Sequence, residues 1–519
     1  MSVVVIRFGF PVFVGAALVG VLFIFVLSRT VRKAATRLPL PPGPRGIPVL
    51  GNALEMPADY AWLKYSEWAA QYGDVVHVSA LGRHIVILSS LNAVNDLLVK
   101  RGSNYSDRPV VPMMDLCGWS LALGFLPYGP RYRASRRMLG GVLSPRAVKG
   151  IASLQEEMVL GFLRKMHAHP EQLQHNARGL AGRQILKLVY DHDITEDGLD
   201  MLVQLAESAL QVFNVSGRPN WLVNVIPSLR HLPEWLPGMG FIGLARHMRE
   251  RVNLMYDTPF EMVKRAMATS HSHSFTATML AGENGQGVSS DEEELIRYVV
   301  GDMYAAGSDT TASGIQSFFL YMVLNQNVQR RAQAEIEQVT GGERLPTCED
   351  RPSLPYIDAL VKEVHRFFPM VPNAMPHCVK EEDVYRGWRI PAGSIVFSNT
   401  WDITRDSALY PDPHVFRPER YFETGASGAL NPDPRSFVFG YGRRECPGKH
   451  LADATIWLAV ARSLASFNIR PVKTANGRDI VPEIKFTGGI ITHPQAFPYA
   501  VEPRSEIARA WLTPDATGH

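Results

Sequence analysis

A single cysteine, Cys446, stands between a glycine-rich turn and an apolar helix pattern, and this stretch constrains the chain more than any other. The turn reads FVFGYGRRECPG over residues 437–448. Pro447 suits the first position of a helix, so the cysteine sulfur should lie at a helix N-terminus. The free amides there, with the basic side chains nearby, favour a thiolate, which can bind iron. Taken alone, a cysteine in this position is more often a small buried hydrophobe.

The residues around the cysteine follow the pattern Phe-x-x-Gly-x-Arg-x-Cys-x-Gly. This pattern resembles the haem-binding signature of the cytochrome P-450 family, the haem-thiolate monooxygenases, at every defining position. The resemblance implies a haem b cofactor, with Cys446 as the axial ligand of the iron. It also implies that Phe439 lies beside the haem and the sulfur and that Arg444 binds a propionate. Gly442 and Gly448 would let the flat cofactor approach the backbone.

A second motif lies in a long helix expected over about residues 291–324 and opened by a capping box over residues 290–293. The centre of the helix, AAGSDTT, contains several poor helix formers, so we expect a distortion there. The stretch resembles the oxygen-activation motif of the same family. By that resemblance, Thr310 hydrogen-bonds dioxygen, Asp309 helps to route protons, and Gly307 leaves room for dioxygen.

Two further motifs fit the same family. Glu363 and Arg366 are three residues apart on an expected helix and face the same way, which alone would indicate an exposed ion pair. The sequence FRPERY at residues 416–421 resembles the family's Pro-x-Arg-Phe element, with tyrosine in the last position. The resemblance places Arg420 with Glu363 and Arg366 in a buried network that holds the loop on the haem side.

The segment PYGPRYRASRRML resembles the family's Trp-x-x-x-Arg element, with Tyr132 in place of the tryptophan and Arg136 retained. Residues four apart share a helix face, so both side chains could reach a haem propionate. Without the resemblance, an arginine-rich helix would be read as a solvated face.

The N-terminus carries twenty consecutive uncharged residues, 8–27, which is the length needed to cross a bilayer as a helix. Basic residues follow, and positive charge there keeps the body of the protein on the cytosolic side. A cleaved signal peptide is the competing interpretation, but its apolar region is usually shorter. We therefore expect a membrane anchor and basic stop-transfer segment at residues 1–37, a proline-rich hinge at 38–52, and a catalytic domain at 53–519. The expected location is the endoplasmic reticulum membrane, with a single pass.

Composition excludes several other classes of protein. The net charge of +3, with both signs interspersed, gives no basic field for nucleic acid. The four cysteines are scattered and form no Cys-x-x-Cys pair, so neither a zinc site nor a disulfide framework is indicated.

The resemblance implies a mainly α fold with small β-sheets, the cytochrome P-450 fold, preceded by one transmembrane helix. The local patterns predict a helix at 61–72, a hairpin of 75–79 with 84–88, and a second hairpin of 385–390 with 394–399. The apolar segment 107–129 suits a loop over a cavity or ordinary core packing. Trp221 and Trp235 lie in an apolar, proline-punctuated segment that suits a membrane interface or ordinary core packing.

The apolar side chains expected to line a substrate pocket indicate a lipophilic small molecule. They are Val110, Met113, Trp119, Val299, Met303, Val371, Ala374 and Ile490.

The implied activity is oxidation of such a molecule with dioxygen and electrons from NADPH. A reductase would dock near Arg133, Arg137 and Lys449 and supply the electrons. The chain resembles fungal microsomal members that act in secondary metabolism or detoxification. A haem-thiolate isomerase or dehydratase without a reductase, and a haem-binding sensor or carrier, remain open alternatives.

Overall fold

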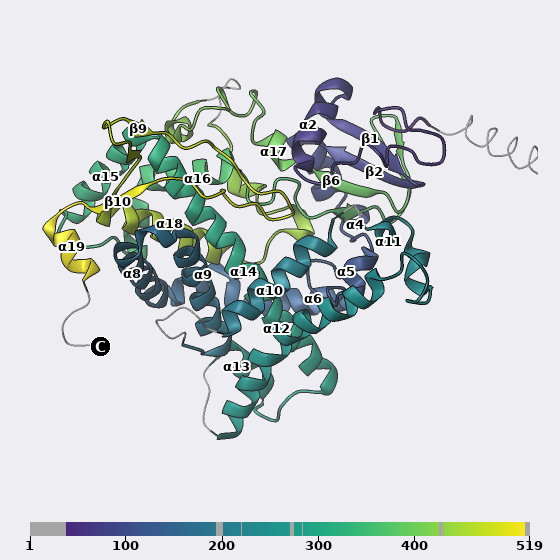
Figure 1. Ribbon diagram of the computed structural model, residues 1–519, viewed down its shortest axis with the longest axis horizontal. Coiled ribbons are helices and arrows are strands. Elements are labelled where there is room, and N and C mark those ends of the chain that lie inside the picture. Colours follow the sequence, from purple (N-terminus) through teal and green to yellow (C-terminus); the bar gives the residue numbers. More distant parts are fainter. Residues whose placement is uncertain are drawn as a thin grey trace, which may run out of the picture.

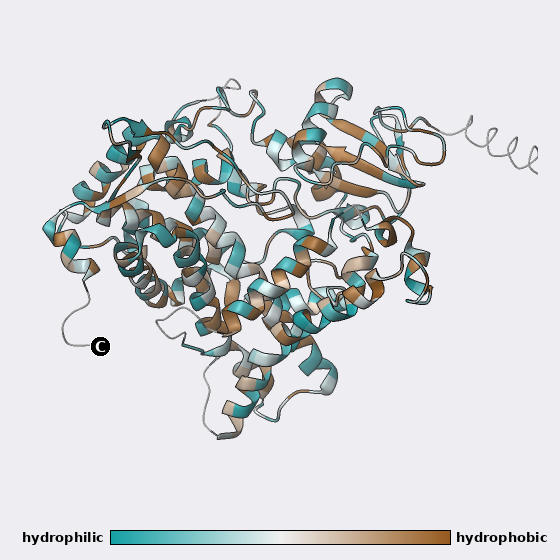
Figure 2. Cartoon of the chain, viewed as in Figure 1, coloured by the Kyte–Doolittle hydropathy of each residue, from teal (hydrophilic) through white to brown (hydrophobic). Residues whose placement is uncertain are grey.

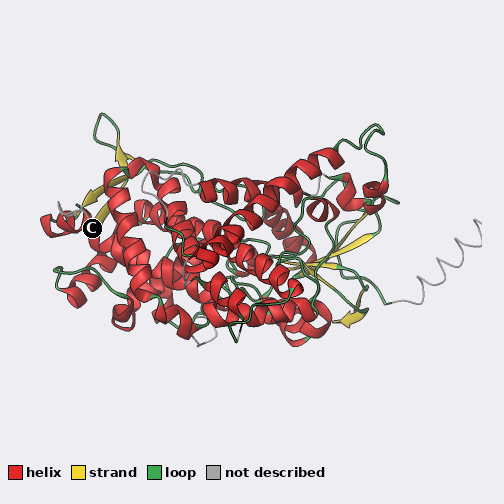
Figure 3. Cartoon of the chain, turned by 90° about the horizontal axis from the view of Figure 1, so that it is seen from below, coloured by secondary structure: helices red, strands yellow, loops and turns green. Residues whose placement is uncertain are grey.

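The computed structural model describes residues 38–193, 201–218, 221–269, 274–282, 284–424, 428 and 430–513. The expected membrane anchor at residues 1–37 lies outside these ranges. Within them, no helix has the length and apolar character needed to cross a bilayer. The fold is mainly helical, and the few strands gather at the periphery (Figures 1 and 3). This architecture confirms the expected mainly α fold with small sheets.

Long helices build the body of the molecule. They are α2 (Ala61–Tyr72), α6 (Pro130–Leu143), α8 (Ala152–Ala168), α9 (Leu173–Tyr190), α10 (Met201–Ser216), α12 (Phe241–Thr269), α14 (Ser290–Leu324), α15 (Gln326–Thr340), α16 (Pro355–Phe367) and α18 (Lys449–Ser466). Shorter helices connect them: α3 (Leu91–Val94), η1 (Asn95–Lys100), α4 (Gly102–Tyr105), α5 (Pro112–Leu116), α7 (Pro145–Gly150), α11 (Leu222–Val225), α13 (Phe275–Ala281), α17 (Thr400–Ile403), η5 (Pro418–Phe422), η7 (Gly442–Arg444) and α19 (Glu506–Leu512).

Helix α14 runs through the middle of the molecule and is shared by the two largest apolar clusters. One cluster joins α14 to α8, α16 and α18, and the other joins it to α9, α10 and α12. The expected distortion at AAGSDTT is not seen, because the helix continues unbroken through those residues. Burial on both sides outweighs their weak intrinsic helix preference, which amounts to less than about 1 kcal/mol per residue.

The capping box of α14 begins one residue earlier than expected. Ser289 is extended and accepts a hydrogen bond from the Glu292 amide, while the Glu292 carboxylate accepts one from the Ser289 amide. The sequence offers a serine at both 289 and 290, and only the backbone conformation decides which of them caps the helix.

The main sheet has the strand order β1-β2-β6-β3, with β1 at Val75–Ala80, β2 at Arg83–Leu88, β6 at Ile395–Ser398 and β3 at His377–Cys378. Strands β1 and β2 form the expected first hairpin. Their apolar residues appear as brown ribbon in Figure 2. The smaller sheets pair β4 (Asp383–Tyr385) with β5 (Trp388–Ile390), β7 (Phe467–Arg470) with β10 (Ala500–Pro503), and β8 (Val472–Lys473) with β9 (Asp479–Ile480).

The second predicted hairpin is wrong. Strand β5 pairs with β4 across a tight turn in which Arg386 and Gly387 both have positive φ, at 50° and 82°. That conformation closes a two-residue hairpin. Strand β6 instead runs parallel to β2, with Ile395 opposite Ile85. Local sequence marked both segments as strands, but their partners were settled by long-range pairing.

The proline-rich segment at residues 38–52 lies against the sheets. The Pro42 carbonyl accepts a hydrogen bond from the His77 amide at 2.8 Å, and the Pro39 carbonyl accepts one from the Arg389 amide at 2.8 Å. A side chain at Gly43 would stand 1.9 Å from the His77 carbonyl oxygen, so only glycine fits there. This segment is therefore fastened to the folded body rather than hanging free from it.

Candidate active site

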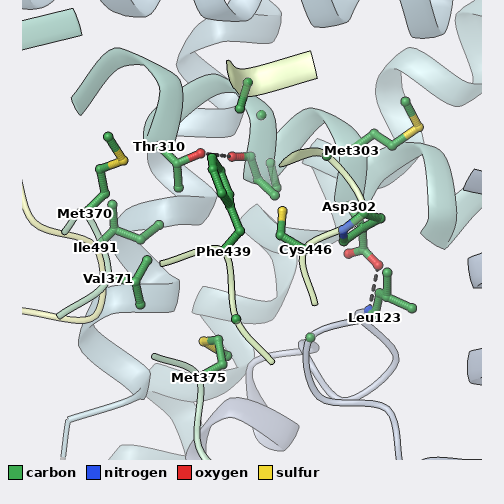
Figure 4. A pocket seen from close by; sticks show the side chains of 18 of the residues that line it. Leu123, Asp302, Met303, Thr310, Met370, Val371, Met375, Phe439, Cys446 and Ile491 are labelled. Carbon is green, nitrogen blue, oxygen red and sulfur yellow. Dashed lines mark hydrogen bonds between the residues drawn. The ribbon is translucent and has the colours of Figure 1, made fainter. Parts of the chain in front are cut away.

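A cavity of about 370 Å³ lies between α14 and the turn that carries Cys446. Its walls come from α6, α9, α10, α14 and α18, and from the segments around residues 369–377 and 490–491. Figure 4 shows Cys446, Phe439 and Thr310 meeting in this cavity. Motifs that lie far apart in the sequence therefore converge on one cavity, whose volume is typical of small-molecule sites.

The turn before α18 holds Cys446 against the cavity. The Cys446 amide donates to the Phe439 carbonyl at 2.7 Å, and Gly440, at a φ of 89°, makes the bend. Helix α18 begins at Lys449, two residues later than the Pro447 start that the sequence predicted. Burial raises the pKa of the Cys446 thiol, while the Gly448 amide and the Arg136 charge act to lower it. A bound metal ion would itself favour the thiolate form.

The glycines of the motif around Cys446 have different structural roles. Gly448 lines the cavity, and a Cβ there would stand 3.9 Å from the Cys446 sulfur. Gly442 does not line the cavity, so its expected role in giving the cofactor clearance is not supported. Its φ is 52°, and a Cβ would stand 2.8 Å from the Leu98 carbonyl oxygen in η1. Gly442 is needed for this close backbone approach, while Gly440, which the motif leaves open, lines the cavity.

Phe439 and His365 meet edge to face on the cavity wall, with ring centroids 5.2 Å apart. Burial lowers the pKa of His365 to about 4, which keeps the imidazole neutral. Phe439 thus lies in the same wall as Cys446, next to an uncharged ring.

Three arginines line the cavity: Arg108, Arg136 and Arg444. None of them forms an ion pair with a residue that the structure describes. Arg136 donates to the Glu445 carbonyl at 2.7 Å, and Arg444 donates to the Ser106 and Leu126 carbonyls at 2.6 Å each. The Nη1 atom of Arg444 is buried and has no hydrogen-bond partner among the described residues. Such a donor group, with no carboxylate at ion-pair distance among the described residues, fits the propionates of a haem.

Tyr132 supports this cluster rather than adding to it. Its hydroxyl donates to the Arg443 carbonyl at 2.8 Å, and the Arg444 guanidinium lies 3.9 Å from the centre of its ring. Both Tyr132 and Arg136 line the cavity, and their contact with a haem propionate stays a prediction.

The third arginine, Arg108, was missed by sequence reasoning. It donates to the carbonyls of Gly124, Met375 and Pro376, and burial together with the nearby Arg444 charge lowers its pKa to about 9. No motif marked it. The one available signal was a basic residue at the start of an otherwise apolar loop.

Thr310 and Asp309 face different spaces although they are neighbours in sequence. The Thr310 side chain lines the main cavity, and its hydroxyl donates to the Ala306 carbonyl at 3.0 Å. Asp309 lines a separate small cavity with Arg178 and lies 3.0 Å from His493. Burial raises the pKa of the Asp309 carboxyl, but the hydrogen bond and charge of His493, with the charge of Arg178, outweigh burial and lower it.

Gly307 lines the main cavity, but its missing side chain also serves helix packing. A Cβ there would stand 2.8 Å from both the Cγ1 and Cδ1 atoms of Ile185 in α9. Room for dioxygen is therefore not the only reason for a glycine at position 307.

The predicted network of Glu363, Arg366 and Arg420 is present and fully buried. Arg366 donates two hydrogen bonds to the Glu363 carboxylate, at 2.8 Å each, and Arg420 donates a third at 3.1 Å. The remaining donors of both arginines reach backbone carbonyls in the loop at residues 404–415. The network thus ties α16 to this loop and to η5.

Five of the residues predicted to form a pocket line the cavity: Trp119, Met303, Val371, Ala374 and Ile490. The other three do not. Val110 is 63% exposed, because it precedes α5 on the outer surface. Met113 and Val299 are buried in the apolar packing around α12, and Val299 lies one helical turn beyond the end of the cavity.

Asp302 is a cavity residue that the sequence analysis did not identify. Its carboxylate accepts hydrogen bonds from the Leu123 amide and the Tyr256 hydroxyl, at 2.7 Å each. Burial raises its pKa to about 7, and these two hydrogen bonds do not offset that effect. An acidic residue one turn before AAGSDTT was the only available signal, and such residues are usually solvated.

A cysteine sulfur and a helix threonine that line one apolar cavity, with arginines at its edge and a buried Glu-Arg-Arg network behind, define the haem-thiolate class of proteins. The chain belongs to the cytochrome P-450 family, whose family model matches residues 41–499. It is 39% identical to cytochrome P-450 monooxygenase 208 of Postia placenta over 503 residues, which cover 96% of each chain.

Two other fungal relatives are similar over most of their length. Cytochrome P-450 monooxygenase claR of Ampulloclitocybe clavipes is 37% identical, covering 94% of this chain and 90% of the relative. Cytochrome P-450 monooxygenase COX2 of Coprinopsis cinerea is 38% identical, covering 91% and 90%. The protein is therefore a cytochrome P-450 monooxygenase, an oxidoreductase that incorporates oxygen, and its family implies a haem cofactor.

Proposed function

We propose that the protein is a membrane-anchored monooxygenase that takes electrons from NADPH through a reductase and oxidises a lipophilic small molecule. The observation that carries this proposal is that Cys446 and Thr310 line the same largely apolar cavity. Haem b bound through Cys446 would supply the iron at which dioxygen is reduced. The fungal origin of the relatives supports a role in secondary metabolism or detoxification.

The chain's own residues divide the remaining work. Arg108, Arg136 and Arg444 would hold the haem propionates through charge-assisted hydrogen bonds. Thr310 holds a hydroxyl group at the cavity wall, where it can pass a proton. The apolar walls exclude water and favour a lipophilic substrate.

The reductase would approach the face that lies next to Cys446. Arg133 and Arg137 are exposed on α6, and Lys449 pairs with Glu445 at 2.6 Å. A positively charged patch of this kind favours an acidic partner surface and speeds its association. Anchoring at the endoplasmic reticulum would rest on residues 8–27.

Reduction of the iron by a fungal NADPH-dependent reductase tests the proposal. We expect the purified protein, reduced under carbon monoxide, to show the absorption band of a thiolate-ligated haem, and Cys446→Ala to abolish it. Cys378→Ala, which removes a cysteine outside the cavity, is the control. Arg137→Glu should slow iron reduction by about ten-fold at low salt and less at high salt. Retention of the band in Cys446→Ala would refute the ligand assignment, and unchanged reduction in Arg137→Glu would refute the docking face.

A further inference from the structure

A histidine near the C-terminus, His493, contacts the carboxylate beside the oxygen-activation threonine. Its Nε2 atom lies 3.0 Å from the Asp309 Oδ2 atom, and the two side chains are 12% and 10% exposed. Arg178 lies farther away, at 3.7 Å from the other carboxylate oxygen, and is 38% exposed. His493 is therefore the closer and better enclosed partner of Asp309.

The position is unfavourable for a histidine except for this contact. The Nδ1 atom of His493 is buried and has no hydrogen-bond partner among the described residues. An unsatisfied buried polar atom costs roughly 1–3 kcal/mol. The contact with Asp309 is thus the one polar contact of the His493 side chain among the described residues.

The loop that carries His493 also forms part of the cavity wall. Ile490 and Ile491 line the cavity, and Figure 4 shows Ile491 next to Met370, on the side where Thr310 lies. At the neck of the loop, the Thr487 amide donates to the His493 carbonyl at 2.8 Å, and the His493 amide donates to the Thr487 hydroxyl at 3.0 Å. A single residue, Thr492, thus separates the cavity wall from the residue that contacts Asp309.

The same loop is attached to α14 one turn farther along. The Ser313 hydroxyl donates to the Thr492 carbonyl at 2.6 Å, and the Thr492 amide donates to the Met370 carbonyl at 2.9 Å. Asp309 and Ser313 are four residues apart and share one face of α14. A displacement of Ile490 or Ile491 by a molecule in the cavity would therefore act directly on the residues that hold Asp309.

We propose that His493 is a positioning residue for oxygen activation. It holds the Asp309 carboxylate at the small cavity that Asp309 lines, and loop 487–493 makes that contact depend on whether the main cavity is filled. The inference rests on the proposed monooxygenase function. In that reaction, RH + dioxygen + NADPH + H⁺ gives ROH + water + NADP⁺, and the protons that form water must reach the cavity in step with the electrons. Asp309 lines the small cavity together with Arg178 and Glu207, and it directly precedes Thr310, which lines the main cavity.

Turnover with 7-ethoxycoumarin as the probe substrate tests the positioning role. In His493→Ala, we expect the ratio of product to NADPH consumed to fall by about ten-fold, hydrogen peroxide to rise, and the solvent deuterium isotope effect to increase. His493→Gln can still donate an N–H to Asp309 and should recover most of the ratio. The matched control is His247→Ala, which breaks an exposed histidine-carboxylate pair with Glu250.

Nitrogen NMR of histidine-labelled protein tests the contact and its coupling to the cavity without turnover. The His493 resonance is identified by its loss in His493→Gln. It should shift in Asp309→Asn, and in wild type it should shift when 4-phenylimidazole fills the cavity, while the His247 resonance stays in place.

The failure of this inference differs from the failure of the proposed function. If wild type shows no thiolate-type carbon monoxide band, the proposed function is wrong. If wild type shows the band but His493→Ala keeps the wild-type product ratio and isotope effect, the positioning role is wrong. An unchanged His493 resonance in Asp309→Asn would overturn the contact, and no response to 4-phenylimidazole would overturn the coupling.

Discussion

Asp302 is the one acidic side chain that lines the main cavity without a cationic partner within hydrogen-bond distance among the described residues. Its two hydrogen bonds come from the Leu123 amide and the Tyr256 hydroxyl. Both can also be made to a neutral carboxyl. Because burial disfavours the charged form, the carboxyl stays protonated in the folded state up to about pH 7.

This raised pKa predicts a pH-dependent stability. The pKa of Asp302 is about 4 in the unfolded chain and about 7 in the folded protein. Between these pH values the unfolded chain loses a proton that the folded protein keeps, so the stability of wild type falls as pH rises. Asp302→Asn lacks this effect. We expect the free energy of unfolding of Asp302→Asn, relative to that of wild type, to increase by up to roughly 4 kcal/mol between these two pKa values. Above the folded pKa the difference should level off.

Thermal unfolding at fixed scan rate from pH 4.5 to about 8 measures the difference. Asp479→Asn, on the exposed strand β9, is the control. A difference between Asp302→Asn and wild type that does not vary with pH would contradict the raised pKa.

At the scale of elements, the Glu363 network joins α16 to the loop at residues 404–415 and to η5. Both arginines are fully buried, and they share one carboxylate. Such a network contributes less than its number of hydrogen bonds suggests, because desolvation offsets much of the attraction. Removing one partner is nevertheless costly, because the remaining charges stay buried.

Glu363→Gln should therefore lower the free energy of unfolding by about 3–5 kcal/mol, since Arg366 and Arg420 would keep their charges without a carboxylate. Urea unfolding, followed by circular dichroism and by the haem absorption, measures this loss. Glu502→Gln breaks an exposed pair with Arg470 and should change stability by less than about 1 kcal/mol. Equal effects of the two substitutions would show that the buried network does not hold the loop.

At the scale of the whole molecule, the described residues between 38 and 513 contain the apolar clusters, the cavity and the hydrogen bonds that attach the proline-rich segment. The uncharged stretch at residues 8–27 precedes them. Folding of the body and attachment to a membrane are therefore expected to be separable.

Deletion of residues 1–37 should leave the unfolding midpoint and the carbon monoxide spectrum unchanged while moving the protein from the membrane fraction to the supernatant after carbonate extraction. The full-length chain, expressed and extracted in parallel, is the control. If the shortened protein remains in the carbonate-washed membranes, another part of the chain anchors it.

The sequence by itself determined the family, the main α-helical architecture and the residues whose roles depend on local spacing. Cys446 with Phe439 and Gly448, Thr310, and the Glu363–Arg366 pair all fall within short motifs, because a turn or a helical repeat places them. The first hairpin was predictable for the same reason.

Only the tertiary structure decided which distant groups meet. His493 and Asp309 are 184 residues apart in sequence, and the partner of β6 and the cavity positions of Arg108 and Asp302 likewise depend on long-range packing. It also placed Val110, Met113 and Val299 outside the cavity and showed that Gly442 is needed for a close approach to the backbone of η1. Side-chain type and local period say that a residue is apolar or charged, but which surface it faces is set by the elements that pack against it.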